Sequence, residues 1–356
     1  MTVRLLNLGK VAYLQSQTTY HAVAHAMADS SPDTITLMTP DRPYVCVGYH
    51  QDISVDVDLE YCRTASVPVL RRAIGGGTVL LDDRQLFFHC ILHRRRAPRR
   101  VADLYQLVLG AAVRTYQRLG IDAHIAPPND IQCAGRKLAG SGAGVVGDAV
   151  VVGGSIIFGF DRDTMSRVAR CPSEGFRAQV RACLDDHMSS LQDEVGPVDH
   201  REVMTSLVDS FTLQLHKQLV PGELTRAELE ERERLDAEFQ SPEWLFGMRR
   251  PCGPVHCVKI ASHIYVCRAQ REEAGMIADL VVSTRDRTIR DLAIDCSPAL
   301  PAGAAEALTT ALRGVTLEEQ EVQPVVESCA ARAGSVRASA GILGCLLDVL
   351  AHLQGL

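Results

Sequence analysis

The segment that most constrains the fold is Arg71–Asp83, which reads RRAIGGGTVLLDD. Three consecutive glycines are unfavourable inside a regular helix or strand, because glycine loses the most backbone entropy and offers no side chain to pack. Directly after two arginines, they indicate backbone that lies close against a ligand, with the guanidinium groups supplying countercharge. A bulge or hairpin turn with two exposed arginines would explain the same letters. The segment therefore predicts either a binding loop or a tight turn.

A second glycine-framed basic segment is NDIQCAGRKLAGSGAG, residues 129–144. Lys137 stands between Gly135 and Gly140, and Asp130 precedes it on an expected strand. The chain has four lysines among its 37 lysines and arginines, so a lysine beside an arginine indicates a place where a compact point charge is needed. A carboxylate and an ammonium near bound phosphate suit metal binding and charge stabilisation. The alternative is a hairpin with a surface lysine.

The hydrophobic pattern predicts an α+β fold with two parts. Short apolar runs bounded by turn residues predict strands in the first half, and VADLYQLVLGAAVRTYQRLG predicts a helix that ends at Gly120. The residue pattern predicts helices from Arg162 to about Gln240. Proline, glycine and the only tryptophan then cluster, which predicts a first domain over 1–240, a linker over 241–254 and a smaller α+β domain over 255–356.

Composition narrows the class of protein. A hydrophobic content of 46% supports real cores, and a formal net charge of −6 argues against a general nucleic-acid binder. No apolar run approaches the roughly 18 residues that span a bilayer, and no secretory signal pattern opens the sequence. We therefore expect a cytoplasmic monomer that binds neither nucleic acid nor membrane. The twelve cysteines lack a disulfide-scaffold spacing and are expected to be mostly reduced, those of PCGPVHC included; zinc there is the less favoured alternative.

Other motifs carry less information. Gly142, Gly144 and Gly147 spell GxGxxG, but a strand pattern follows where a dinucleotide fold needs a helix. Two histidine pairs, His21 with His25 and His89 with His93, are four residues apart, and both are interpreted as packed or exposed rather than metal-binding. The run HRRRAPRR is either a solvated loop or a docking patch for an acidic partner.

Three segments together resemble the lipoate–protein ligase A family of the biotin/lipoate ligase superfamily: RRAIGGGTVLLDD, NDIQCAGRKLAGSG and VVVGGSIIFGFD. Their order and spacing agree with that family. SPEWLFGMRRP resembles the W-x-F-G segment that joins its catalytic domain to an accessory domain, and the text beyond it resembles that accessory domain. The resemblance covers most of the chain. It implies a mixed-sheet catalytic domain followed by a small α+β domain.

The resemblance also implies roles for named residues. Arg71 and Arg72 would position ligand and adenylate, and Gly75, Gly76 and Gly77 would pack against an acyl tail. Lys137 would contact the carboxylate and the α-phosphate, with Asp130 near the phosphate and its Mg²⁺. The remaining positions that match the family's substrate and nucleotide site are Asp82, Asn129, Gly140, Ser141, Gly154 and Ser155.

The implied enzyme uses ATP and Mg²⁺ to activate lipoate or octanoate as acyl-AMP, and then acylates a lysine of a carrier protein. Carriers of this kind are dehydrogenase E2 lipoyl domains, the glycine-cleavage H protein and H-like proteins. The alternatives are an ATP-independent octanoyltransferase, a biotin ligase and a lipoyl-binding protein without activity. The transferase needs a cysteine shortly before the GRK turn, where HIAPPNDI has none and Cys133 lies too close to the turn.

The chain departs from the family in three places. Leu81-Asp82 replaces a common His-Asp, Arg84-Gln85 replaces Gly-Asn, and Gly153 replaces a histidine of the third segment. These changes leave the fold prediction intact and bear on the choice of ligand and on the activation of the acceptor lysine.

Overall fold

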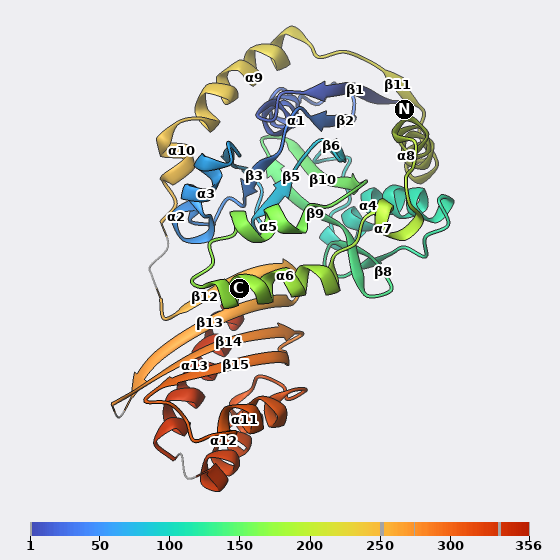
Figure 1. The fold of residues 1–356 in the computed structure, drawn as a ribbon. Coiled ribbons are helices and arrows are strands. Elements are labelled where there is room, and N and C mark those ends of the chain that lie inside the picture. Colours follow the sequence, from blue (N-terminus) through green and yellow to red (C-terminus); the bar gives the residue numbers. More distant parts are fainter. Residues whose placement is uncertain (1, 250–252, 274, 334–335, 356) are drawn as a thin grey trace. The chain divides into compact units, whose positions relative to one another are not determined.

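The computed structural model describes residues 2–249, 253–273, 275–333 and 336–355 (Figure 1). The chain divides into two compact units. The first unit comprises Met1–Arg170 and Asp185–Arg250, and the second comprises Cys171–Leu184 and Pro251–Leu356. The segment 171–184 thus belongs with the C-terminal residues, although the expected first domain, 1–240, contains it. Each unit is described by itself below.

An eight-stranded mixed sheet, counted over the described residues, forms the centre of the first unit. Its strands lie in the order β11 (Leu219–Pro221), β1 (Val3–Val11), β2 (Thr34–Pro40), β6 (Gln85–His93), β10 (Ala149–Ile157), β9 (Arg136–Val146), β8 (Asp130–Cys133) and β7 (His124–Ala126). β1 pairs in parallel with β2 and β11, and the other neighbours are antiparallel. The strands predicted at residues 85–92 and 149–157 therefore lie side by side in the middle of the sheet.

The two faces of this sheet have different neighbours. Phe88 of β6 packs in an apolar core with residues of α4 (Val101–Arg118) and α8 (His200–Leu215). Ile91, on the opposite side of the same strand, packs with Tyr20 of α1 (Gln15–His25) and with Ile74 of the glycine segment. Because successive side chains of a strand point to opposite faces, β6 is buried along its whole length. We call the side that carries α1 and Ile74 the α1 face.

A smaller sheet carries the first arginine of the glycine segment. It has the order β4 (Val69–Arg71), β3 (Tyr44–Val47) and β5 (Val79–Leu81), so the glycines connect its two outer strands. The other helices of the first unit are α2 (Ile53–Asp56), α3 (Leu59–Thr64), α5 (Arg162–Val168), α7 (Leu191–Val195), α9 (Arg226–Phe239) and α10 (Pro242–Phe246). Helix α9 begins with a capping box between Thr225 and Glu228.

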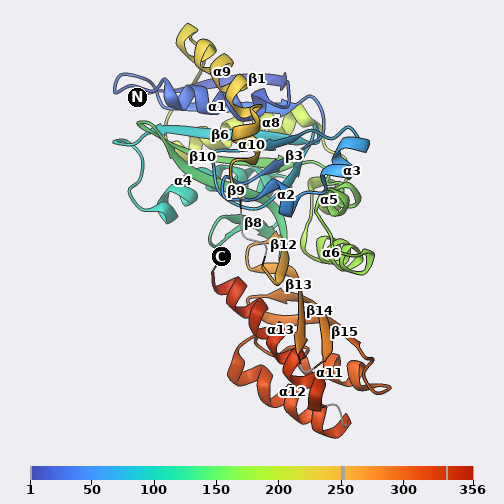
Figure 2. The same cartoon turned by 90° about the vertical axis from the view of Figure 1, so that its left-hand side faces the viewer.

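The second unit packs helices on one antiparallel sheet (Figure 2). The strands are β12 (Val255–Ala261), β13 (Ile264–Glu273), β14 (Met276–Arg285) and β15 (Thr288–Ser297), in that order. The core joins β13, β14 and β15 to α11 (Ala304–Leu312), α12 (Glu319–Ala333) and α13 (Val336–Gln354). Helix α6 (Glu174–His187) contacts this unit through Phe176, whose ring lies 5.6 Å from that of His256. The predicted α+β class is confirmed.

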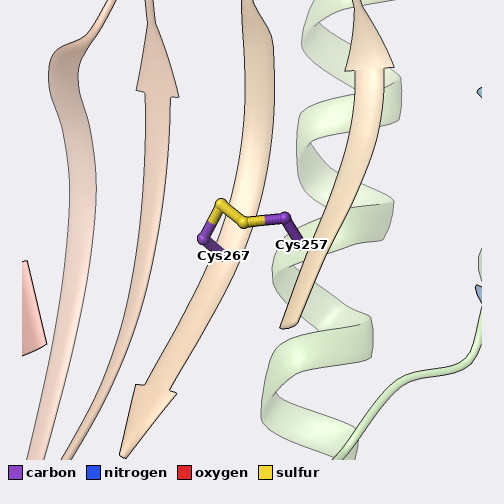
Figure 3. The surroundings of a disulfide bond; sticks show 2 residues. All are labelled: Cys257 and Cys267. Carbon is purple, nitrogen blue, oxygen red and sulfur yellow. A yellow bond between two sulfur atoms is a disulfide. The ribbon is translucent and has the colours of Figure 1, made fainter. Parts of the chain in front are cut away.

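A disulfide links two strands of the second unit. Cys257 of β12 and Cys267 of β13 are directly opposite in the ladder, and their sulfur atoms are bonded (Figure 3). The expectation that the cysteines of PCGPVHC are ordinary thiols is therefore wrong for Cys257, because the register of the hairpin brings it to a partner ten residues away. Cys252 of the same motif lies outside the described residues. None of the helices described here is both long and apolar enough to cross a membrane.

Candidate active site

The glycine segment is held by the second arginine that precedes it. The guanidinium of Arg72 donates to the carbonyl of Gly75 at 3.0 Å, to that of Gly77 at 2.8 Å and to that of Cys46 at 3.1 Å. Gly76 has a φ of +105°, which side chains rarely adopt. The loop therefore depends on both residues: Arg72 closes it by hydrogen bonds, and Gly76 adopts the backbone conformation that its turn requires.

Arg71 has a different environment from Arg72. Its side chain is 1% exposed, and its nitrogens donate to the carbonyls of Gly48, Tyr49 and Gln51 on one side and to those of Trp244 and Leu245 on the other. The indole of Trp244 donates in return to the carbonyl of Arg71 at 3.0 Å. Burial lowers the pKa of Arg71, and the nearby Asp52 opposes this shift. Arg71 thus connects the turn at 48–51 to α10, rather than presenting its charge to a ligand.

Lys137 and Asp130 form an ion pair across the β8–β9 hairpin. Lys137 Nζ lies 2.9 Å from Asp130 Oδ1, and the two side chains are 17% and 2% exposed. Gly140 is directly opposite Asp130 in the ladder, and a Cβ built on it would lie 2.9 Å from Lys137 Nζ. The glycine therefore leaves room for the lysine side chain in the position that it takes along its own strand. The backbone of Lys137 is fixed by Ser189, whose amide donates to its carbonyl at 2.8 Å.

The two glycine-framed segments meet on one strand. A Cβ on Gly142 would lie 3.0 Å from Ile74 Cγ2 and 4.0 Å from the carbonyl oxygen of Gly75. Gly140, under Lys137, and Gly142, under the glycine segment, are two residues apart on β9 and so share a face. The lysine and the triple glycine therefore lie over adjacent positions of the α1 face.

The third segment contributes to the same face through Gly153. Gly153 pairs with Gly142 of β9 and with His89 of β6, and a Cβ on it would lie 2.8 Å from the ring of His89. Ser155, two residues further, shares this face and lies 3.4 Å from Gln85 Oε1 through its hydroxyl. Glycines at 140, 142, 144 and 153 leave this part of the sheet without side chains of its own.

Four of the predicted site residues do not reach Lys137 by the contacts that the structure gives them. Gly154 points to the opposite face, where a Cβ would lie 2.7 Å from Phe88, and Ser141 is its partner in the ladder. Ser141 and Asn129 bond to each other, the Ser141 hydroxyl donating to the Asn129 carbonyl at 2.6 Å. The buried carboxylate of Asp82 is bound by Arg84 at 2.7 Å. Burial raises the pKa of Asp82, and Arg84 opposes the shift.

Sequence reasoning missed a buried polar cluster on the α1 face, made of Tyr20, His21, Thr36 and His89. The signal was available in part: His89 and Gly153 lie in two runs that the pattern predicts as strands. Their pairing, however, is a tertiary property. A histidine is absent from position 153, and the ring of His89 occupies the space beside it.

Thiols near the site are buried. Cys46 lies against Arg72, and Cys133 belongs to the apolar core on the face opposite to Asp130. Burial raises the pKa of both thiols. A nucleophilic cysteine needs access and a low pKa, so neither fits that role. Among the described residues, no group of three or more histidine, cysteine or acidic side chains forms a metal site.

The basic run HRRRAPRR is largely engaged within the molecule. Arg94 pairs with Asp148 at 2.9 Å, Arg95 with Asp29 at 2.8 Å and Arg96 with Asp33 at 2.9 Å. Arg96 also donates to the carbonyl of Ser31 at 2.8 Å. Arg95 and Arg96 connect the loop after β6 to the loop before β2, and Arg94 connects it to the turn between β9 and β10. The contacts identify these three arginines as structural tethers.

The candidate site thus combines a glycine-lined face of a mixed sheet, a loop closed by an arginine and a lysine–aspartate pair. The model of the lipoyl protein ligase A/B catalytic domain matches residues 12–212. The chain belongs to this family of enzymes, which act in lipoyl or octanoyl transfer to proteins.

The similar proteins include both octanoyltransferases and lipoate-protein ligases. The octanoyltransferase LipM of Kyrpidia tusciae is 30% identical over 270 residues, which cover 68% of this chain and 98% of the relative. Subunit 1 of lipoate-protein ligase A from Thermoplasma acidophilum is 26% identical, covering 58% of this chain and 82% of the relative. In structure, the bipartite lipoate protein ligase of T. acidophilum, solved in a study of that ligase and its E2 lipoyl domain, matches with a TM-score of 0.65 at 23% identity, covering 71% of this chain and 99% of that one.

Proposed function

We propose that this enzyme activates lipoate or octanoate with ATP and transfers the acyl group to a lysine of a lipoyl-accepting carrier protein. The observation that carries the proposal is the Lys137–Asp130 pair, whose nitrogen and oxygen lie 2.9 Å apart beside the glycine segment. A fixed ammonium on a side-chain-free part of the sheet suits a ligand that presents a carboxylate and then a phosphate. The carrier would be an E2 lipoyl domain, an H protein or an H-like protein.

The reaction has two steps, and Lys137 can assist both. In the first, the carboxylate oxygen of the acid attacks the α-phosphorus of ATP, and the bond to pyrophosphate breaks to give acyl-AMP. In the second, the amine of the acceptor lysine attacks the acyl carbon, AMP leaves with the bonding electron pair, and the amine loses a proton. Both transition states gather negative charge on oxygen, and the ammonium of Lys137 is held ready by Asp130.

Asp130, which lies beside Lys137, would supply a protein oxygen to the magnesium ion of the nucleotide. Mg²⁺ in such sites is bound by one or two carboxylates together with substrate phosphates. The carboxylate of Asp130 can supply this ligand while its other contact, to Lys137, is kept. The ion would neutralise phosphate charge, whereas Lys137 acts on the oxygen at which the acyl and phosphoryl groups join.

A second candidate is an octanoyltransferase that carries the acyl group as a cysteine thioester, without ATP. The similarity to LipM of Kyrpidia tusciae favours it, because that relative is matched over nearly its whole length. The site chemistry speaks against it, since Cys46 and Cys133 are buried and the pKa of each thiol is raised. Burial disfavours the thiolate that would have to attack the acyl donor.

One assay separates these candidates. The purified chain is incubated with an isolated lipoyl domain and either free acid with MgATP or an octanoyl-carrier protein without ATP, and the mass of the lipoyl domain is followed. The ligase predicts acylation and pyrophosphate release with acid and ATP only. Acylation from the carrier without ATP would contradict the ligase and support the transferase. Failure with both donors would contradict the proposed function.

A further inference from the structure

A cluster of buried polar side chains lies on the α1 face beside Gly153. Nδ1 of His89 lies 3.0 Å from the hydroxyl oxygen of Thr36. The ring of His89 stacks on that of Tyr20 at a centroid distance of 4.0 Å, and the ring of Tyr20 contacts that of His21 at 4.3 Å. His89 therefore has one ring nitrogen fixed by a hydrogen bond and one ring face fixed by stacking. Its orientation is set by the protein alone.

The cluster is incompletely satisfied. Nε2 of His21 is buried and has no hydrogen-bond partner among the described residues, and the side chain is 1% exposed. A buried polar atom without a partner is destabilising, so such atoms are rare in folded proteins. Burial lowers the pKa of His21 and of His89 to about 3. Both imidazoles are therefore neutral near pH 7 and can act through hydrogen bonds, but not as cations.

The cluster lies at one end of the glycine-lined part of the sheet. His89, Gly153 and Gly142 form a row across β6, β10 and β9, and Gly140, under Lys137, is two residues along from Gly142. Two strand spacings and two residues of rise place His89 roughly 12 Å from Gly140 along the sheet. An extended eight-carbon acyl chain spans a comparable length. Gly153 also stays partly exposed in a central strand whose neighbouring residues Val151 and Val152 are buried.

We propose that His89 contacts the far end of the acyl substrate and favours the dithiolane ring of lipoate over the methyl end of octanoate. This inference rests on the proposed function. A disulfide sulfur is polarisable, accepts weak hydrogen bonds and packs well against aromatic rings, whereas a methyl group offers no hydrogen-bond partner to Nε2 of His89. His89 is buried, and the edge of its ring lies next to Gly153, which has no side chain to cover it. The expected preference is on the order of threefold to tenfold.

The test is a binding measurement on the whole chain. Isothermal titration gives the Kd of free lipoate and of free octanoate for the wild type, for His89→Phe and for His93→Phe. Phenylalanine at position 89 keeps the stack on Tyr20 and removes both ring nitrogens. His93 is the matched control, because it lies on the same face of β6 four residues away and is equally buried. The wild type and His93→Phe are expected to prefer lipoate, and His89→Phe is expected to bind both acids equally.

The outcomes distinguish this inference from the proposed function. Equal Kd values for the two acids in the wild type would overturn the role of His89, whatever the variants do, and so would an unchanged preference in His89→Phe. If His89→Phe does not fold, His89→Gln, which keeps a hydrogen-bonding group, is compared with His93→Phe. A preference in His89→Gln as large as in the control is then expected, and its loss would overturn the hydrogen-bond argument. Binding of neither acid to the wild type would contradict the proposed function instead.

Discussion

The first unit buries charged and polar side chains in its centre, whereas the second unit is held by an apolar core. Arg71, Asp130, His21 and His89 of the first unit are each less than 9% exposed. Within the described part of the second unit, the buried polar side chains are Ser283 and Thr284. Its core consists of apolar residues of β13, β14 and β15 packed on α11, α12 and α13.

The two units both pack helices on a sheet, but they differ in how many polar groups they bury. Burying a polar group is costly unless it is hydrogen-bonded, and burying a charge is more so. In the first unit, backbone carbonyls offset this cost at Arg71, and Lys137 offsets it at Asp130. The cost is not offset at Nε2 of His21, which has no hydrogen-bond partner among the described residues. The second unit buries fewer polar groups, although the buried hydroxyl of Thr284 has no hydrogen-bond partner among the described residues. We therefore expect substitutions at the buried polar groups to alter activity and acid sensitivity in the first unit, and covalent or apolar changes to alter stability in the second.

The largest effect is expected on activity, from Lys137→Met. Loss of the ammonium should lower the rate of acyl-AMP formation by about 10²–10³-fold, because its charge stabilises the transition state. The variant also leaves Asp130 buried without its ion pair, which lowers the free energy of unfolding. Lys137→Met combined with Asp130→Asn should recover stability but not rate. Pyrophosphate release and urea denaturation measure the two quantities.

A comparable rate in Lys137→Met and the wild type would show that Lys137 is structural, like Arg71. Recovery of the rate in the double variant would lead to the same conclusion. Lys137→Arg sharpens the test, because a guanidinium keeps the charge but replaces the compact ammonium with a planar fork. A rate well below that of the wild type is expected for it.

The next effect concerns stability alone, in Arg71→Met. Five backbone carbonyls would lose their donors, and the expected cost is about 3 kcal/mol in the free energy of unfolding of the first unit. Hydrogen exchange should rise first in α10 and in the turn at 48–51. Arg226→Met is the matched control, since this arginine is exposed and pairs with Glu230 on one helix, where such pairs contribute little. Unchanged exchange in α10 would contradict the role given to Arg71.

Many strands and helices could be predicted from the sequence because their apolar patterns reflect the burial that the fold imposes, but β1 and β11 were not predicted, and β11 lies in a region interpreted as helical. The run QLFFHCIL is buried on both faces, and the helix at residues 101–118 buries one side. In both elements the pattern of apolar residues therefore indicates the secondary structure directly. No element was predicted for residues 15–25, where α1 forms. Its residues 16–24 are all buried, polar ones included, so the helix has no contrast between two sides.

The candidate site was predictable where it depends on neighbours in the sequence, and not where it depends on pairing. The glycine framing of Lys137 indicated its position beside Asp130 correctly. Arg71 is explained by contacts 173 and 174 residues away, at Trp244 and Leu245, which no local pattern shows. Gly154 was chosen over Gly153 by resemblance to a motif, although strand alternation puts these two residues on opposite faces. The roles of the residues in catalysis remain predictions.

Per residue, a smaller effect is expected from acid. His21 and His89 have folded-state pKa values of about 3, against 6.5 when unfolded, so between these values the unfolded chain binds protons that the folded chain excludes. Stability of the first unit should therefore fall as the pH falls through this window, by about 2 kcal/mol per histidine between pH 7 and pH 5. Urea denaturation at several pH values checks this, and His89→Phe should lose about half of the dependence.

The second unit provides the internal reference for this measurement. Its described histidines, His256, His263 and His352, are not buried. Hydrogen exchange in β13 and β14 should therefore respond less to the same change of pH than exchange in β6 and α1. An equal response in both units would mean that the buried histidines do not set the acid sensitivity.

The smallest effect is expected from the disulfide, and it should be confined to the second unit. Joining Cys257 to Cys267 closes a short loop, and the two residues are already opposite each other in a formed ladder, so its loss should lower the free energy of unfolding by at most roughly 2 kcal/mol. Reduction, or Cys257→Ala with Cys267→Ala, should increase exchange in β12 and β13 and leave the first unit unchanged. Thiol titration in denaturant should count two more thiols after reduction. A lower rate of acyl-AMP formation after reduction would contradict the prediction that the disulfide affects the second unit only.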